Sequence, residues 1–168
     1  MMWLGTYAML TPGVDVGTAA SVRLDLDNEP QPDGHLRLPA SQGSTATIDA
    51  DGYVSGAPDL VVEVTASTVS IDMHLKLQLY RRHGVREYVV WRTIDDEIDW
   101  FVLRDGEYVR LALDGDGWYR SQRFPGLWLH PDTLLHGFPI AIHTMMHEGM
   151  KSAEHAAFAN KIATSAMS

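Results

Sequence analysis

The stretch Pro58-Asp-Leu-Val-Val-Glu-Val-Thr65, with the segments 71–83 and 87–91 that follow it, decides the fold. Its central Leu-Val-Val run is continuous and apolar, which predicts a strand covered on both faces. Glu63 directly follows this run, and a carboxylate is costly to bury there without a partner. We therefore expect Glu63 either to meet a cation or to lie where the strand opens into a cleft.

A helix and a second strand are predicted next in the chain. Residues 71–83 carry an apolar stripe of helical spacing, the segment Ser67-Thr-Val-Ser70 can cap it, and Gly84 can end it. Glu87 to Trp91 is typical of a further strand. A strand, a helix and a strand in this order indicate a βαβ-like unit or a short αβ hairpin of one sheet.

The rest of the chain predicts a single α+β domain over 1–168, with an α/β-like core and antiparallel hairpins in its C-terminal half. Strands are expected at 21–26 and 34–39, an exposed hairpin or loop at 40–56, and hairpin strands at 98–103 and 108–113. After a turn, residues 118–124 continue the chain and 125–129 pack back toward the sheet, followed by a short helix at 131–135 and a C-terminal helix at 141–168. The opening residues resemble the end of an element, so an N-terminal truncation is expected.

Composition narrows the class of protein. The chain has 168 residues, is 45% hydrophobic and 21% charged, and contains no cysteine. It lacks the apolar run of roughly 18 residues that a membrane span needs, and it shows no secretory signal. Without cysteine there are no disulfides and no thiolate zinc sites, which fits a cytoplasmic protein. A net charge of −9 argues against indiscriminate binding to nucleic acid.

Charge is unevenly distributed. Acidic residues dominate from Arg23 to Glu63, and basic residues dominate from Ser70 to Arg92. This pattern is compatible with a metal site beside a helix that faces phosphate. It is also compatible with two solvated surfaces of opposite sign.

Three polar residues of these segments could carry chemistry together: Asp33, Glu63 and Lys76. Carboxylates that end adjacent strands can bind a hard divalent cation such as Mg²⁺. The cation lowers the pKa of a bound water, and a lysine can orient that water or hold a phosphate. The plainer alternative is that Lys76 forms a helix-surface pair with Asp72, four residues earlier.

Other candidates have plainer explanations. Asp59 is expected to form a turn, and the tyrosines 80 and 88 to lie at core edges. His143 and His147 are spaced for a metal on a helix, but no third ligand is evident. The hydroxyl residues of 67–70 have no adjacent histidine that would activate a nucleophile.

Several motifs resemble a known family. They are Gln-Pro-Asp at 31–33, Gly-Ala-Pro-Asp-Leu-Val-Val-Glu-Val at 56–64, Asp72-x-x-x-Lys76-x-x-x-Tyr80, Gly-Val-Arg-Glu-Tyr at 84–88, Leu-Arg-Asp-Gly at 103–106 and Phe-Pro-Gly-Leu-Trp-Leu at 124–129. In this order they are similar to the Uma-two family of putative restriction endonucleases, in the PD-(D/E)XK nuclease superfamily. The resemblance spans about residues 7–135. It implies a restriction-endonuclease-like mixed sheet flanked by helices that cuts phosphodiesters with Mg²⁺.

The resemblance assigns roles residue by residue. Asp33 and Glu63 match the two metal-binding carboxylates, and Thr65 stands where the superfamily has its lysine. Lys76 matches the helix lysine that substitutes for it in the family. Asp72 then joins the site or aligns Lys76, and Gln31 at the start of the first motif supports Asp33.

The resemblance therefore implies a Mg²⁺-dependent endonuclease acting on DNA, with Mn²⁺ as a substitute cation. A homodimer is expected by analogy with nucleases that cut both strands, and Met145, Met146 and Met150 are a candidate contact surface. The alternative is a binding or interaction protein that keeps the nuclease fold without its chemistry. The acidic net charge, Thr65 and the absence of an acidic residue in 1–10 favour that alternative.

Overall fold

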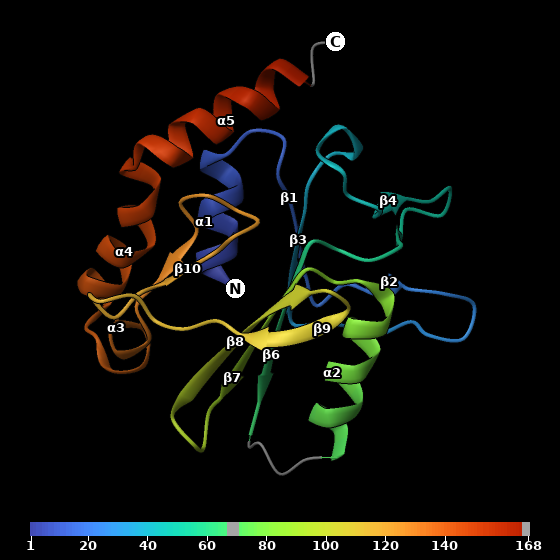
Figure 1. Ribbon diagram of the computed structural model, residues 1–168, viewed down its shortest axis with the longest axis horizontal. Helices are drawn as coiled ribbons and strands as arrows, with labels where there is room; N and C mark the ends of the chain where they lie inside the picture. Colours follow the sequence, from blue (N-terminus) through green and yellow to red (C-terminus); the bar gives the residue numbers. More distant parts are fainter. Residues whose placement is uncertain (67–70, 166–168) are drawn as a thin grey trace.

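Six strands form one mixed sheet through the middle of the computed structural model, which describes residues 1–66 and 71–165 (Figure 1). Their order across the sheet is β1-β3-β6-β7-β8-β9, and only β6 and β7 pair in parallel. The strands are β1 (Asp15–Thr18), β3 (Gly34–Arg37), β6 (Leu60–Thr65), β7 (Glu87–Arg92), β8 (Glu97–Arg104) and β9 (Glu107–Arg110). The mixed sheet and the antiparallel C-terminal strands confirm the predicted α+β class.

Helices cover both faces of this sheet. One face is covered by α2 (Ile71–His83), and the other by α1 (Met2–Leu10), α4 (Pro139–Glu148) and α5 (Ala153–Ser165), with the short α3 (Pro131–His136) beside them (Figure 1). The larger core lies beneath α1, α4 and α5 and contains Tyr7, Trp100 and Phe124. The smaller core lies beneath α2 and contains Val61, Tyr80 and Tyr88. The protein therefore buries apolar side chains on both faces of its central strands.

Side chains of β6 alternate between these two cores, as in any strand. Val61 packs in the smaller core beneath α2, and Glu63 contacts that helix too. Val62 and Val64 face the opposite side, where they help to line an apolar cavity of about 170 Å³ together with Trp3 and Trp91. Glu63 thus faces α2 and not the apolar cavity.

The end of α2 directs the chain straight into β7. Gly84 has a φ of +81°, a conformation that glycine adopts without strain, and the N–H of Val85 bonds to the carbonyl of Tyr80 at 3.0 Å. This confirms the predicted helix end. The predicted cap at 67–70 lies outside the described residues.

Smaller elements surround the main sheet. A three-stranded sheet contains β2 (Val22–Arg23), β5 (Val54–Ser55) and β4 (Thr47–Ile48), and a hairpin pairs β10 (Tyr119–Arg120) with β11 (Trp128–Leu129). Single 3₁₀ turns occupy Ala40–Gln42 and Gly149–Lys151. The strand predicted at 21–26 is only two residues long, because the Asp25 side chain accepts bonds from Asp27 and Asn28 and turns the chain early. Likewise, β9 ends at Arg110, earlier than the predicted 113.

The C-terminal segment 141–168 contains two helices rather than one. A Cβ on Gly149 would lie 2.3 Å from the carbonyl oxygen of Gly126, so the chain there packs too closely against its neighbour for a larger residue. Ser152 then begins α5, because its hydroxyl accepts a bond from the N–H of His155 at 3.2 Å. Residues 166–168 lie outside the described part.

The methionines of this segment face inward. Met145 and Met146 are 3% and 6% exposed and belong to the larger core, and Met150 packs against it. Met145 and Met146 are therefore not available for the predicted subunit contact, because their side chains are buried within one chain, whereas a contact through the half-buried Met150 stays a prediction. Among the described helices, none has the length and apolar character needed to cross a membrane.

Candidate functional site

Lys76 and Glu63 meet where α2 crosses β6. The Nζ atom of Lys76 lies 2.9 Å from Oε2 of Glu63, and the hydroxyl of Tyr80 donates to Oε1 at 2.7 Å. Because Lys76 and Tyr80 are four residues apart on α2, they present their polar atoms on one face of the helix. Glu63 is only 4% exposed, so both of its oxygens are held by this helix in a largely dry environment.

Asp33 joins the site from the neighbouring strand. It immediately precedes β3, whose antiparallel register pairs Gly34 with Val62, and continuing that register places Asp33 opposite Glu63. Oδ2 of Asp33 accepts a bond from the backbone N–H of Val64 at 2.7 Å. Opposed residues of antiparallel strands project on the same face. The fold therefore brings together Asp33, Glu63 and Lys76, which are far apart in sequence.

Opposing effects set the protonation of Glu63. Burial raises the pKa of its carboxyl, while the hydrogen bonds from Lys76 and Tyr80 and the charge of Lys76 lower it. The negative charge of Asp33 raises it further, which shows that the two carboxylates interact. Burial dominates, so the pKa of Glu63 is above its ordinary value. A bound cation would favour the ionised form.

The carboxylate side chains at this site are suited to bind a hard cation. Two carboxylates on opposed strands supply oxygen atoms, and Mg²⁺ is commonly held by one or two carboxylates with water completing its octahedron. Within the described residues, no group of three or more His, Asp or Glu side chains is arranged to hold a metal. Asp72 lies in the first turn of α2, and its side chain lies outside the described part. The rings of His143 and His147 are 4.6 Å apart on α4.

Two further predicted residues flank the site. The Gln31 amide donates to the carbonyl of Ala19 at 2.6 Å, and the N–H of Ala19 donates to the carbonyl of Asp33 at 3.2 Å. Gln31 is thus linked to Asp33 through the backbone of Ala19. Thr65 ends β6, and its carbonyl accepts bonds from the N–H and the hydroxyl of Thr93. That carbonyl is therefore engaged with the end of β7.

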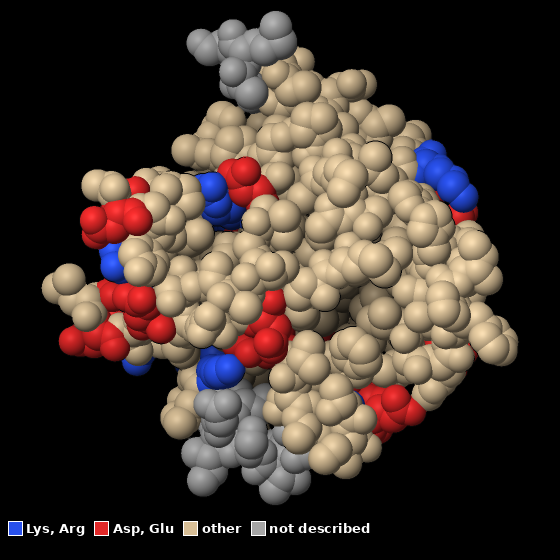
Figure 2. Space-filling view, turned by 180° about the vertical axis from the view of Figure 1, so that it is seen from behind, with Lys and Arg blue, Asp and Glu red and all other residues tan. Residues whose placement is uncertain are grey.

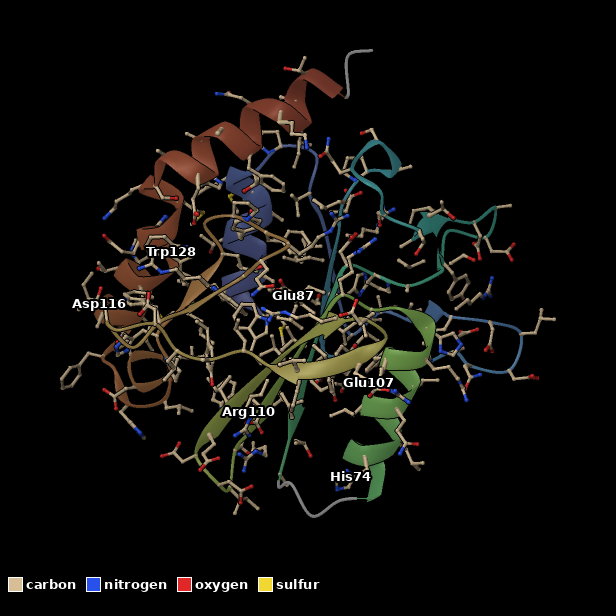
Figure 3. All side chains as sticks on the ribbon, viewed as in Figure 1. His74, Glu87, Glu107, Arg110, Asp116 and Trp128 are labelled. Atoms are coloured by element: carbon tan, nitrogen blue, oxygen red, sulfur yellow. The ribbon has the colours of Figure 1, made fainter. Side chains whose placement is uncertain are left out.

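A cluster of charges lies on the same face of the sheet, two strands from Glu63. The register pairs Glu63 with Val90 and Val90 with Asp99. Asp99 is 3% exposed and contacts both Arg92 and Arg110, and Arg92 also contacts Asp95 and Glu97. Arg110 lies along β9 in Figure 3. The positive charge of Arg92 is already balanced by three carboxylates, so this cluster joins the strands β7, β8 and β9.

Two other carboxylates are buried at the opposite end of β6 and β7. Oδ2 of Asp59 accepts a bond from the N–H of Leu38 at 2.9 Å, and Oδ1 contacts the Arg123 guanidinium at 2.7 Å. Asp59 is 2% exposed, so the prediction that it merely forms a turn is wrong. A carboxylate buried this deeply requires a cation, and no local pattern in the sequence identified Arg123, 64 residues away.

Glu87, at the centre of the molecule in Figure 3, is wholly buried. It accepts four hydrogen bonds, from the side chains of Trp100 and Ser121 and from the backbone N–H groups of Gln122 and Arg123. All four sites around its carboxylate are used by the protein itself. Glu87 therefore fastens the segment after β10 to the sheet, which in turn places Arg123 beside Asp59.

Basic side chains are sparse on the face shown in Figure 2. Among the described residues of that face, the blue atoms form isolated spots beside red ones, and no continuous basic band is visible. This agrees with the net charge of −9. Any polyanion held at the site would depend on local contacts more than on a broad positive surface.

Comparisons with known proteins agree with this architecture. Residues 3–132 match the family Uma2, described as "Putative restriction endonuclease". The fold is similar to a crystal structure of a "putative nuclease belonging to DUF820" from Anabaena variabilis, with a TM-score of 0.57 and 12% sequence identity over 80% of this chain and 74% of that one. A search of curated proteins finds no match.

Proposed function

This chain belongs to the Uma2 family of restriction-endonuclease-like proteins, and we propose that it hydrolyses phosphodiester bonds of DNA with the aid of Mg²⁺. The observation that carries this proposal is the convergence of Asp33, Glu63 and Lys76 where β3, β6 and α2 meet. Two oxygen ligands beside an ammonium group suit a hard cation and a phosphate. The proposal names the substrate as DNA and the cation as Mg²⁺, with Mn²⁺ as its substitute.

The residues of the site have separate tasks in this proposal. Asp33 and Glu63 would hold the cation, which when bound supplies a water of lowered pKa and offsets charge on the phosphoryl oxygen. The bond from Val64 fixes one oxygen of Asp33 and leaves Oδ1 for a ligand. Lys76 is 31% exposed at its side chain, so its ammonium can reach both Glu63 and a phosphate at the surface. From there it would orient the attacking water or hold the scissile phosphate.

The chain also controls the charge state of this site. The raised pKa of Glu63 means that its carboxyl loses its proton at higher pH than an ordinary glutamic acid. Lys76 opposes that effect by favouring the carboxylate, and it does so from a position that would also face the substrate. Removing the ammonium group of Lys76 would therefore weaken both cation binding and the contact with the substrate.

A catalytically inactive binding protein with the same fold is the second candidate. Two observations favour it: both oxygens of Glu63 are engaged by α2, and basic side chains are sparse on the face of Figure 2. In that case the contact between Lys76 and Glu63 would be a structural ion pair. Titration with Mn²⁺ separates the two candidates, because only the nuclease needs cation binding that depends on Asp33 and Glu63.

Plasmid nicking tests the proposal directly. Supercoiled DNA is incubated with Mg²⁺ and with Mn²⁺, using wild type, Glu63→Gln and Asp33→Asn, and Glu107→Gln as a control. Glu107 is an exposed carboxylate on β9, 73% exposed at its side chain, whose surface ion pair contributes little to stability. We expect nicking by wild type and the control, and loss of at least about 100-fold in the two site variants. Equal nicking by Glu63→Gln and wild type would contradict the proposed role of Glu63 in holding the cation.

We also propose that the protein acts as a homodimer, because one site cuts one strand and two related sites cut both. The buried methionines of α4 leave another surface to form the contact. Light scattering coupled to size exclusion measures the mass in solution. A mass near 37 kDa, twice the 18.7 kDa of one chain, is the expected result, and a mass of one chain at all concentrations contradicts it.

A further inference from the structure

Tyr80 holds the one oxygen of Glu63 that Lys76 does not contact. Its hydroxyl lies 2.7 Å from Oε1, and Lys76 lies 2.9 Å from Oε2. The terminal torsion of a glutamate side chain has a broad energy profile, so a carboxylate with one partner can still rotate. With a donor on each oxygen, the plane of the Glu63 carboxylate is fixed.

The tyrosine itself is rigidly placed. Tyr80 is 0% exposed, and its ring packs against that of Tyr88 with 5.1 Å between centroids. Tyr88 in turn stacks on Phe101 and Tyr108. The hydroxyl at the end of the Tyr80 ring donates to Oε1 of Glu63. It cannot leave Glu63 without disturbing an aromatic cluster.

We propose that Tyr80 is a positioning residue for the metal site: its bond to Oε1, together with that of Lys76 to Oε2, fixes the orientation of the carboxylate that would hold the cation. This inference rests on the proposed function. It adds a residue that neither touches the substrate nor binds the cation. Removing a residue that orients a metal ligand in this way typically lowers metal affinity about 10- to 100-fold.

A matched control exists within the same aromatic cluster. The Tyr108 hydroxyl donates to the carbonyl of Val85 at 2.9 Å, and its ring lies 6.1 Å from that of Tyr88. Tyr108→Phe therefore removes a phenol hydroxyl and one hydrogen bond from this core without touching Glu63. Tyr80→Phe removes the same atoms but takes a donor from Glu63. A difference in Mn²⁺ affinity between the two variants therefore reports the loss of the hydrogen bond to the Glu63 carboxylate.

The test measures Mn²⁺ affinity by electron paramagnetic resonance for wild type, Tyr80→Phe and Tyr108→Phe, without DNA. Thermal unfolding of each variant runs in parallel. We expect affinity to fall about 10- to 100-fold in Tyr80→Phe and to stay at the wild-type value in Tyr108→Phe. In nicking assays, Tyr80→Phe should lose kcat at low Mn²⁺, regain it as Mn²⁺ is raised, and keep the KM for DNA.

The outcomes separate this inference from the proposed function. Wild-type affinity in Tyr80→Phe overturns the positioning role even when wild type binds Mn²⁺ and nicks DNA. An equal loss in both variants also overturns it, because general destabilisation then explains the effect. If wild type itself neither binds Mn²⁺ nor nicks DNA, the proposed function fails first, and the positioning role fails with it.

Discussion

The ammonium of Lys76 lies 2.9 Å from the buried carboxylate of Glu63, thirteen residues earlier in the chain. One helix thus provides the counter-charge for a strand carboxylate that would otherwise be costly to bury. The same contact supplies a cation at the point where the two strands bring their acidic side chains together. If the site acts as proposed, stability and chemistry depend on the same ion pair.

Replacing Lys76 tests this coupling. Lys76→Met keeps the aliphatic stem and removes the charge, so we expect nicking to fall by at least about 100-fold. Because Lys76 lowers the pKa of Glu63, the rise of activity with pH should also move to higher pH. Arg82→Met, at an exposed position on the same helix, is the control and should behave as wild type. Unchanged activity in Lys76→Met would make the pair purely structural.

Glu63 should also make stability depend on pH. Since the pKa of Glu63 is higher in the fold than in the unfolded chain, its contribution is favourable below the unfolded value near 4.5 and is lost as pH rises through the folded value. Glu63→Gln does not titrate. We therefore expect the stability of Glu63→Gln relative to wild type to increase as pH rises above about 4.5. Urea unfolding at several pH values measures this, and a stability of Glu63→Gln that falls relative to wild type as pH rises contradicts it.

His35 should weaken the fold in acid. It is 2% exposed on β3, its Nδ1 has no hydrogen-bond partner among the residues that the structure describes, and burial together with the charge of Arg37 lowers its pKa from 6.5 to about 4. Between these values the unfolded chain binds a proton that the folded chain excludes, so stability falls as pH drops from 6.5 to 4. The loss is about 3 kcal/mol at most.

His35→Phe keeps a flat ring at this position and removes the titrating group. A Cβ added at Gly17 would lie 2.1 Å from the His35 ring, so the ring lies directly against Gly17 of the neighbouring strand β1. The variant should lose less stability between pH 6.5 and 4 than wild type in urea unfolding. The same acid sensitivity in both proteins would assign it to other groups.

Arg123 is expected to be essential for stability rather than for chemistry. It contacts the 2% exposed Asp59, and removing one partner of a buried ion pair costs about 3 kcal/mol or more. We expect Arg123→Ala to lower the free energy of unfolding by that amount. Arg86, 54% exposed at its side chain and 4.0 Å from the same carboxylate, provides the control, since Arg86→Ala should change stability little. Equal losses in both variants would mean that Arg123 has no special role.

The sequence predicted the centre of the sheet better than its margins. The apolar run at 60–62, the helix at 71–83 and the alternation of β8 appear as expected. The predicted apolar stripe of α2 does not, because Leu75 is 60% exposed and Tyr80 and Leu77 pack in the core instead. The strands β2, β4, β5, β10 and β11 have two residues each, which is too short for a period to be recognised. The break between α4 and α5 depends on close packing of Gly149 against Gly126, a contact between distant segments.

At the candidate site, too, the sequence predicted the residues better than the contacts between distant segments. Family motifs named Asp33, Glu63 and Lys76, and the strand register and α2 bring the three together, although their roles stay predictions. Tyr80 was expected only to lie at a core edge. Its spacing of four from Lys76 indicated a shared helix face, but a hydrogen bond to Glu63 depends on the depth at which α2 packs.

Because side chains alternate along β6, the number of residues between two positions decides which face of the sheet each side chain takes. Arg123 contacts Asp59 just before the start of β6, and α2 holds Glu63 four residues later, while Val61 and Val62 between them pack in two different cores. Losing or gaining one residue within this span would turn Glu63 toward the apolar cavity and a valine toward Lys76. The spacing between these two acids must therefore stay constant for Asp59 to reach Arg123 while Glu63 faces α2.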